Sequence, residues 1–556
     1  MNLRPWQSAA LEQALKWLIQ DRVDRHFLIN AAPGSGKTLV SCAIANQLIQ
    51  SHEIERVIVI APRAEVVNQW SDEYRSVTTR HMTKVTASDG EIAALNLDIC
   101  ATWAAIQGLL PELQAVCRVN KTLVICDEHH HAAVEAAWGT SADSAFSSAK
   151  FVLVLTGTPI RSDSEKTIWL AYDDAGSIEH PAAGTYTLTY GEAVDLGYCR
   201  PVTFHRHEGK FTVDLEDGDS VTVSGNSPVE LPKELKRIPG LQTALSFYRL
   251  ARTPQYEHDN VTPLRDGYQA TMIEYAKNKL SELRYRMPNA GGLVIAPSID
   301  VAKYMAALIE LIESEKPLIV HSQMPNPELK IKAFKNTDKR WLVSVAMVSE
   351  GVDIQRLRVL IYLPNALTEL AFRQAIGRVV RTQGYDDDTR AYVIMPSFET
   401  FEQYARRVEE EMSPSTRMEN VQLRHKRCPI CNTESPLKSD ICPNCEHSFP
   451  VASPSKKSCL ECGAINMTGA TSCHTCGYDF GHNFKLTLDE ALRIGAIVRG
   501  MDIDEEEVRL AEELAPRLRN KILKSGDQKL IKLLKILPEE SWGRLKILME
   551  QSKNSN

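Results

Sequence analysis

The sequence of 556 residues lacks several features that would place it in a membrane or on an exported route. No run approaches ~18 consecutive apolar residues, so the sequence predicts no membrane-spanning helix. Its first seven residues lack the charged-then-apolar pattern of a signal peptide. We therefore expect a cytoplasmic protein with no membrane partner. The chain as a whole has no excess of basic residues, since its formal net charge is −7. Any nucleic acid must therefore bind in a local groove.

What is present fits a globular protein of several domains. Hydrophobic residues make up 43% and charged residues 24%, which allows large cores. At about 150 residues per domain, the length indicates three or four domains. Of the 13 cysteines, five are scattered among apolar neighbours and are interpreted as buried thiols. These five are Cys42, Cys100, Cys117, Cys126 and Cys199.

A glycine-bearing loop at 31–38 is the organising motif of the first half. It follows an apolar run at 27–29 and precedes a helix-favouring segment at 39–50, so a strand is expected to end in a phosphate-binding turn. Lys37 would reach the β- and γ-phosphates and Thr38 would bind Mg²⁺. The first glycine of the pattern G-x-x-x-x-G-K-[ST] is missing, because Ala31 stands there. The remaining nucleotide-binding candidates are Ala32, Pro33, Gly34, Ser35 and Gly36.

An acidic pair ends a second apolar run, at 123–126. Asp127 is predicted to hold Mg²⁺ and Glu128 to position or deprotonate a water molecule, because the carboxyl ends of parallel strands carry ligand groups. The alternative is a solvated acidic turn. Three consecutive histidines follow, and they cannot all converge on one ion, so His130 is interpreted as a coupling residue.

Apolar runs alternate with helical segments from residue 1 to about 195 and again from 271 to 412. This alternation predicts two parallel sheets covered by helices, an α/β architecture. Two loops of the first lobe, at 61–63 and 102–103, could touch a polymer backbone, and the two hydroxyls at 156–158 could bridge the acidic pair to a neighbouring lobe. Four polar residues of these loops are therefore candidates for coupling to nucleic acid. They are Arg63, Thr102, Thr156 and Thr158.

The second lobe has no phosphate loop, but it has a helical segment with two arginines. Gln374, Arg378 and Arg381 are spaced i, i+4 and i+7, so they share one helical face. Presented to the phosphates of the first lobe, Arg378 and Arg381 would act as arginine fingers. The alternative is a surface helix with ordinary ion pairs.

The order of these motifs resembles that of superfamily two helicases of the DEAH/DExH type. Gln7 in an Arg-Pro-Trp-Gln context resembles the Q motif. The further matches are 31–38 to motif I, 61–63 to Ia, 127–130 to II, 156–159 to III, 292–296 to IV, 349–353 to V and 374–381 to VI. The resemblance implies two RecA-like lobes that close on ATP, with nucleic acid across their tops. It also places Gln7, Gly351, Asp353 and Gln374 near the nucleotide.

Between the lobes, 196–270 is predicted to be a linker or insertion. Two short alternating segments flank 216–219 and predict a β-hairpin.

Eight cysteines between residues 428 and 476 form a tandem repeat. Each cysteine recurs after 31 residues, and each repeat holds two C-x-x-C turns. Four thiolates complete the tetrahedron of a structural zinc ion, so two zinc ribbons are predicted, at 425–449 and 456–480. The ligands are Cys428, Cys431, Cys442 and Cys445, then Cys459, Cys462, Cys473 and Cys476. Lobes followed by such modules resemble RadD-type bacterial repair helicases.

The tail from 484 to 556 is predicted to be helical, because Thr487 opens a capping box and leucines form a stripe at 530–537. The zinc ribbons and this tail are candidate surfaces for a protein partner. Together the motifs predict a nucleic-acid-dependent ATPase that acts on DNA rather than RNA, in repair or genome maintenance. An RNA helicase, the motor of a restriction or phage-defence system and a zinc-bearing scaffold with a degenerate ATPase are the alternatives.

Overall fold

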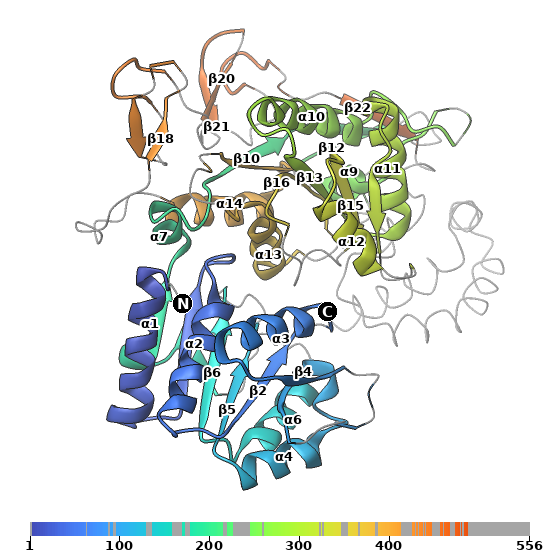
Figure 1. Ribbon diagram of the computed structural model, residues 1–556. Helices are drawn as coiled ribbons and strands as arrows, with labels where there is room; N and C mark the ends of the chain where they lie inside the picture. Colours follow the sequence, from blue (N-terminus) through green and yellow to red (C-terminus); the bar gives the residue numbers. More distant parts are fainter. Residues whose placement is uncertain are drawn as a thin grey trace, which may run out of the picture.

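The computed structural model describes residues 3–487, with gaps (Figure 1). The gaps are 63, 87–88, 90, 93–95, 129–135, 158–168, 173–177, 215–219, 226–244, 258, 260, 322–323, 325–326, 346–353, 365–366, 384–386, 388, 413–424, 429, 432, 437–438, 440, 448–455, 460, 468–472, 479 and 481–482.

The first lobe is built on a seven-stranded parallel sheet in the order β3-β4-β2-β5-β6-β1-β9. All four strands expected from apolar runs are present; β3, β4 and β9 are additional. The bounds are β1 His26–Ala31, β2 Arg56–Ala61, β3 Met82–Val85, β4 Asp98–Thr102, β5 Thr122–Cys126, β6 Phe151–Thr156 and β9 Thr185–Leu188. A short antiparallel pair joins β7 (Ala171–Tyr172) to β8 (Ile178–Glu179).

The second lobe is built on a six-stranded parallel sheet in the order β10-β17-β16-β13-β15-β14. Its five expected strands are present. The bounds are β10 Val202–His207, β13 Gly291–Ala296, β14 Leu318–Val320, β15 Trp341–Val345, β16 Leu357–Tyr362 and β17 Ala391–Pro396. Both central sheets are buried on both faces, which explains why their strands are continuous apolar runs. The chain thus has the predicted fold class, two RecA-like parallel-sheet lobes.

Helices cover the sheets and connect their parallel strands. In the first lobe they are α1 Pro5–Leu15, η1 Lys16–Asp21, α2 Lys37–Gln50, α3 Ala64–Thr78, η2 Trp103–Ala105, α4 Leu110–Val119, α6 Ala136–Phe146 and η3 Ala182–Gly184. Helix α7 (Tyr190–Asp195) follows the first lobe in sequence and packs against the second (Figure 1). In the second they are α9 Phe247–Arg252, α10 Tyr268–Arg286, α11 Ile299–Glu313, α12 Pro327–Lys335, α13 Glu369–Val379 and α14 Glu399–Glu411. Figure 1 shows α13 and α14 on the side of the second lobe that faces the first.

The segment predicted as a linker contributes directly to the second lobe. Its strand β10 forms the edge of the six-stranded sheet, so a lobe boundary at residue 271 lies too late in the chain. Arg206 interrupts the apolar pattern of β10, so the sequence did not predict this strand. The Arg206 guanidinium forms an ion pair with Glu409 of α14 at 3.1 Å. The predicted hairpin is present as β11 (Lys210–Asp214) and β12 (Ser220–Ser224).

A strand from beyond the cysteine modules completes this hairpin. Residues Asn483–Thr487 form β22, which pairs with β11 in parallel. Phe484 and Leu486 pack into the core of the second lobe. The tail predicted to be helical from 484 therefore begins with a strand, because these alternating apolar residues fill a sheet face. The rest of that prediction, from 488 onward, lies outside the described residues.

Two small hairpins carry the four-cysteine clusters. They are β18 (His425–Arg427) with β19 (Glu434–Pro436), and β20 (Lys456–Ser458) with β21 (Ile465–Met467). Figure 1 places both on the side of the second lobe away from the first lobe. Since α14 precedes them and β22 follows them, the second lobe anchors the pair of modules at both ends.

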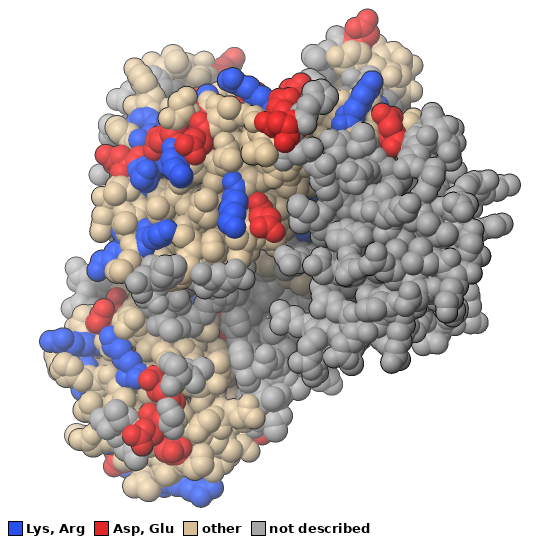
Figure 2. Space-filling model, turned by 90° about the vertical axis from the view of Figure 1, so that its right-hand side faces the viewer, with Lys and Arg blue, Asp and Glu red and all other residues tan. Residues whose placement is uncertain are grey.

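The described surface matches the modest net charge. On the face in Figure 2, lysine and arginine are interspersed with aspartate and glutamate over the described residues. Within the described ranges, no helix combines the length and apolar character that crossing a membrane requires.

Candidate nucleotide site between the lobes

The phosphate loop leaves β1 and ends where α2 begins. Gly34 and Gly36 have φ angles of 80° and 104°, which residues other than glycine rarely adopt. Gly36 precedes α2, whose first residue is Lys37, so the helix N-terminus opens directly at the loop. Backbone N–H groups and the positive helix end make this turn suited to binding phosphate. Ser35 is buried, and its hydroxyl donates to the Ala32 carbonyl at 2.7 Å.

Lys37 lies between the start of the loop and the end of β6. Its Nζ donates to the Ala31 carbonyl at 2.8 Å. A Cβ built on Gly157 would lie 2.9 Å from the same Nζ, so a larger residue at Gly157 would displace the lysine. Ala31 needs no glycine-like freedom here because it is the last residue of β1.

Asp127 and Glu128 follow β5 at the same edge of the sheet. The Asp127 N–H donates to the Ile60 carbonyl at 2.9 Å, which extends the pairing of β5 with β2. Burial and the adjacent Glu128 raise the pKa of the Asp127 carboxyl to about 6, against opposing effects of Trp70 and Lys37. Glu128 has a φ of 48°, a left-handed conformation that is strained for a non-glycine residue.

Two residues at the start of α1 form hydrogen bonds with carbonyl groups of the phosphate loop. The Gln7 side chain donates to the Gly36 carbonyl at 3.0 Å and accepts from the Arg4 N–H at 2.8 Å. The Arg4 guanidinium donates to the Ser35 carbonyl at 2.7 Å and lies 4.6 Å from the ring centre of Tyr198. Gln7 is buried, so in this structure its amide supports the loop.

The second lobe approaches the loop through α13, which begins after the N-cap Thr368. A Cβ built on Gly377 would lie 2.7 Å from Pro33 Cβ, and one built on Gly34 would lie 2.8 Å from Arg381 Cγ. Both glycines therefore allow a close approach of the two lobes. The Arg381 Nε donates to the Gly377 carbonyl at 3.2 Å, which orients this side chain along the helix end.

Residues from both lobes line a single cleft of about 250 Å³. It brings together most of the predicted nucleotide and catalytic residues. From the first lobe these are Pro33, Gly34, Gly36, Lys37, Thr38, Asp127 and Glu128, and from the second they are Gln374, Arg378 and Arg381. Thr38 and Asp127 offer the hard oxygen ligands that Mg²⁺ prefers.

The connection between the lobes touches both halves of this cleft. The Cys199 thiol donates to the Pro33 carbonyl at 3.2 Å, and its backbone pairs with that of Arg381. Arg200 then bonds the Val379 carbonyl at 2.6 Å and the Asp387 carboxylate at 2.5 Å. Burial raises the pKa of the Cys199 thiol to about 12, so this cysteine stays a neutral donor.

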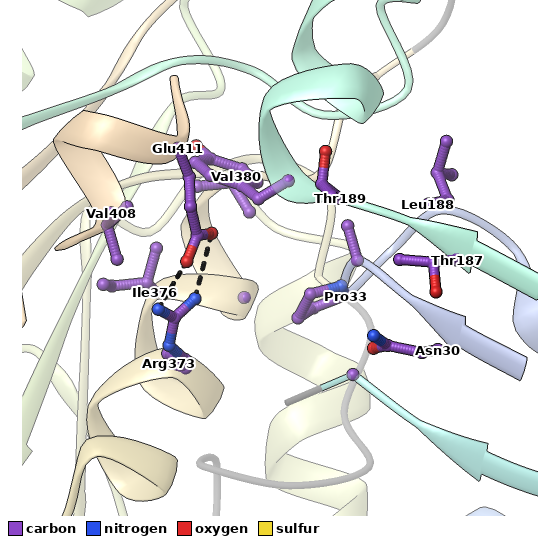
Figure 3. Close-up of a pocket in the computed structure, with 14 residues that line it drawn as sticks. Asn30, Pro33, Thr187, Leu188, Thr189, Arg373, Ile376, Val380, Val408 and Glu411 are labelled. Carbon is purple, nitrogen blue, oxygen red and sulfur yellow. Dashed lines mark hydrogen bonds and ion pairs between the residues drawn. The ribbon is translucent and has the colours of Figure 1, made fainter. Parts of the chain in front are cut away.

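A second cavity of about 180 Å³ adjoins the cleft and shares Pro33, Gly157 and Gly377 with it. Figure 3 shows Pro33 and Asn30 on one wall and the Arg373–Glu411 ion pair on the other. The Arg373 guanidinium bonds both carboxylate oxygens, at 2.6 and 3.1 Å. This ion pair joins α14 to α13, the helix that carries Arg378 of the cleft.

The residues predicted to couple nucleic acid are only partly described. Thr102 and Thr156 are buried at the ends of β4 and β6, so their hydroxyls are not on the described surface. The remaining predictions lie outside the described residues. They are Arg63, His130, Thr158, Gly351 and Asp353.

The cysteine modules each gather four thiols in a group that could hold a metal ion. In both clusters the sulfur atoms lie within 4.8 Å of one another. Backbone N–H groups donate to the sulfurs, as from Thr475 to Cys473 at 3.4 Å. The residue after a C-x-x-C turn is left-handed at Glu446, Gly463 and Gly477. All eight predicted ligands therefore converge as two sets of four.

Sequence reasoning missed several residues that support the cleft. Arg4, Trp70, Trp103 and Cys199 each contact the phosphate loop or Asp127. The spacing of Arg4 to Gln7 was visible within the Q-motif segment. No local pattern marks the two tryptophans or Cys199, because their partners are distant in sequence.

Two family models match the chain. Residues 1–161 match "Type III restriction enzyme, res subunit", and residues 276–383 match "Helicase conserved C-terminal domain". An uncharacterized protein of Mycobacterium tuberculosis is 34% identical over 383 residues, covering 68% of this chain and 59% of that protein. One of Mycobacterium leprae is 33% identical over 412 residues, covering 73% and 64%. The chain thus spans about three fifths of the length of these relatives.

Among solved structures, the type ISP restriction-modification enzyme LlaBIII bound to DNA is similar at 17% identity and a TM-score of 0.44. The match covers 71% of this chain and 28% of that one. The two family models match the two lobes in their order along the sequence. With two RecA-like lobes and these matches, the chain is similar to helicases of superfamily two in both lobes.

Proposed function

We propose that this chain is a nucleic-acid-dependent ATPase that couples hydrolysis to lobe closure and to movement along DNA. One observation supports this most directly. Lys37, Asp127 and Glu128 of the first lobe line the same cleft as Arg378 and Arg381 of the second. Phosphoryl transfer depends mainly on positioning and on neutralising charge at the transferred phosphoryl group. The cleft supplies both, but only with the two lobes together.

Each residue has a role that follows from its position. Lys37 and the N–H groups at the start of α2 bind the phosphates, while Thr38 and Asp127 hold the metal. When bound there, Mg²⁺ would supply positive charge that offsets the charge of the phosphates. Glu128 orients the attacking water and accepts its proton. Arg378 and Arg381 stabilise the charge that develops on the γ-phosphoryl oxygens.

The substrate is DNA, and the biological setting is repair. The tandem four-cysteine modules support this choice, since lobes followed by such modules resemble RadD-type repair helicases. Each module would hold one structural zinc ion, because its four thiols can supply all the ligands that such an ion takes. Such an ion stabilises the small hairpins, which have little core of their own.

A second candidate is the motor of a restriction or phage-defence system. The match of 1–161 to a restriction-enzyme subunit favours it. This role requires a nuclease activity in addition to the motor. Co-purification of a nuclease with the tagged protein from its native cells would favour this candidate over repair.

The deciding experiment is steady-state ATPase with single-stranded, duplex and branched forms of both DNA and RNA. We expect stimulation by DNA and loss of turnover in Lys37→Ala, with an unchanged melting temperature. Stronger stimulation by RNA would identify an RNA helicase instead. Absence of turnover with every nucleic acid would favour the scaffold, and wild-type turnover in Lys37→Ala would refute the site.

A further inference from the structure

Two buried indoles donate hydrogen bonds to the same residue, Asp127. The Trp70 Nε1 donates to Asp127 Oδ2 at 2.8 Å, and the Trp103 Nε1 donates to the Asp127 backbone carbonyl at 3.0 Å. Trp70 is 1% exposed and Trp103 is fully buried. The side chain and the main chain of Asp127 are therefore both held by ring N–H groups from other elements.

Packing alone does not require tryptophan at these places. A buried indole N–H that lacks an acceptor costs about 1–3 kcal/mol. Phenylalanine would fill much of the same core space without that requirement. Here the acceptor of Trp70 is a carboxylate, and hydrogen bonds to an ionised group are shorter and stronger than neutral ones. The bond fixes the direction in which the Asp127 carboxylate faces the cleft.

The two tryptophans come from segments that lie next to predicted nucleic-acid contacts. Trp70 is on α3, which begins at Ala64, directly after Arg63 in the sequence. Trp103 directly follows Thr102 at the end of β4. The strands that lead into these segments are β2 and β4, which pair with each other. Strand β2 also pairs with β5, the strand that Asp127 directly follows.

Helix α3 also borders the nucleotide cleft itself. Val66, Gln69 and Glu73 of α3 line the same cleft as Asp127. A shift of α3 therefore changes both the wall of the cleft and the donor that holds the carboxylate. Helix α3 thus runs from directly after Arg63, a predicted nucleic-acid contact, to Trp70 in its second turn, which bonds the predicted metal ligand Asp127.

We propose that Trp70 is a positioning residue that orients Asp127 toward Mg²⁺ and transmits nucleic-acid binding at α3 to the metal site. Trp103 fixes the backbone of Asp127 in the same way. This inference rests on the proposed function. It adds that the coupling of DNA to hydrolysis runs through the indole N–H of Trp70.

The test compares Trp70→Phe with Trp17→Phe. Trp17 is a matched control, because it is buried in the same lobe and its Nε1 donates to the His26 carbonyl at 2.8 Å, outside the cleft. Equilibrium binding of a fluorescent, non-hydrolysable ATP analogue is titrated with Mg²⁺ and repeated in EDTA. ATPase is measured with and without single-stranded DNA.

In Trp70→Phe we expect the Mg²⁺ concentration for half-maximal binding to rise about tenfold, which corresponds to roughly 1.4 kcal/mol. Binding in EDTA should be unchanged and DNA stimulation should be lost, while Trp17→Phe should match wild type. Melting curves establish that each variant is folded. Should Trp70→Phe not fold, Trp103→Phe serves instead, with a smaller shift in the same direction.

The outcomes separate this inference from the proposed function. A wild-type protein without Mg²⁺-dependent nucleotide binding and without DNA stimulation would overturn both. Wild-type stimulation together with identical Mg²⁺ titrations for Trp70→Phe and Trp17→Phe would overturn the role of Trp70 alone.

Discussion

Gly34 of the first lobe faces Arg381 of the second so closely that a Cβ on Gly34 would lie 2.8 Å from Arg381 Cγ. The two residues are far apart in sequence, and they meet only because the lobes close on the phosphate loop. The backbone pairing of Cys199 with Arg381 holds the arginine at this place. The absence of a side chain at Gly34 therefore permits both the left-handed backbone of the turn and the close approach of Arg381.

Gly34→Ala should lower ATP turnover by about tenfold or more, equivalent to roughly 1.4 kcal/mol or more at the barrier. The new methyl group pushes Arg381 away from the phosphates. Gly463→Ala is the control, because its φ is also left-handed, at 71°, but nothing lies within 4 Å of its Cβ position. An ATPase rate in Gly34→Ala as high as that in Gly463→Ala would contradict the importance of the close contact with Arg381.

Asp387→Asn should destabilise the second lobe. Asp387 pairs with Arg200 at 2.5 Å and with Arg358 at 2.9 Å, and both guanidiniums are almost fully buried. Burial raises the pKa of Asp387, but the two arginines outweigh it and lower the pKa to about 2. Removing the charge of Asp387 leaves two buried guanidiniums without an anionic partner. The free energy of unfolding should therefore fall by about 3–5 kcal/mol.

Urea unfolding measures this loss, and Glu282→Gln is the comparison. Glu282 forms a largely exposed pair with Lys279 on α10, which is worth about 1 kcal/mol or less. Similar free energies of unfolding for both variants would contradict a structural role for the Asp387 cluster.

His205 should make the second lobe less stable in acid. Burial, with the charges of Lys279 and Arg206, lowers its pKa to about 4, against about 6.5 when unfolded. Between these values the unfolded chain binds more protons than the native one. Stability is therefore fully present above about pH 6.5 and decreases as pH falls toward 4.

His205→Phe keeps a ring against Tyr275, whose centroid lies 3.5 Å from that of His205, but it cannot titrate. Melting temperatures from pH 7 to pH 4 should therefore fall less steeply in the variant than in wild type. Parallel curves would show that His205 does not contribute to the acid sensitivity.

Zinc content should follow the two cysteine clusters independently. Cys442→Ser should leave one of two bound ions, and Cys473→Ser should do the same for the second module, because each ion needs four thiolates. Cys117→Ala should retain both ions, since this thiol is in the core of the first lobe. Elemental analysis of the purified proteins provides the measurement. Loss of both ions from either variant would contradict two independent sites.

Loss of the second ion should also loosen β22. This strand directly follows the second module and pairs with β11 in parallel. Hydrogen exchange at Phe484 and Leu486 should increase in Cys473→Ser and stay unchanged in Cys117→Ala. Unchanged protection in both variants would show that β22 is held by the core of the second lobe alone.

The local motifs could be predicted because their chemistry depends on neighbours in sequence. A phosphate loop needs a strand, a turn with left-handed glycines and a helix within about twenty residues, and 26–50 supplies all three. The central strands were readable because burial on both faces makes them continuous apolar runs. The cysteine repeat was readable because a structural metal site needs two C-x-x-C turns at a short distance.

The strands that were missed lie at or near sheet edges, or pair with segments remote in the chain. In β10, Arg206 is paired with Glu409, so a buried position carries a charge that an apolar pattern excludes. In β22, the partner β11 lies more than 250 residues earlier, and no local signal specifies that pairing.

The sequence by itself determined the two parallel sheets, the phosphate loop, the acidic pair, the arginine face and both sets of four thiols, because short-range periodicity and spacing specify them. Tertiary structure alone decided that Gly34 meets Arg381, that Trp70 holds Asp127 and that Cys199 touches both halves of the cleft. These contacts depend on how two lobes pack and on which core side chains find hydrogen-bond partners. Such packing is set by the whole chain at once, so no single segment of the sequence encodes it.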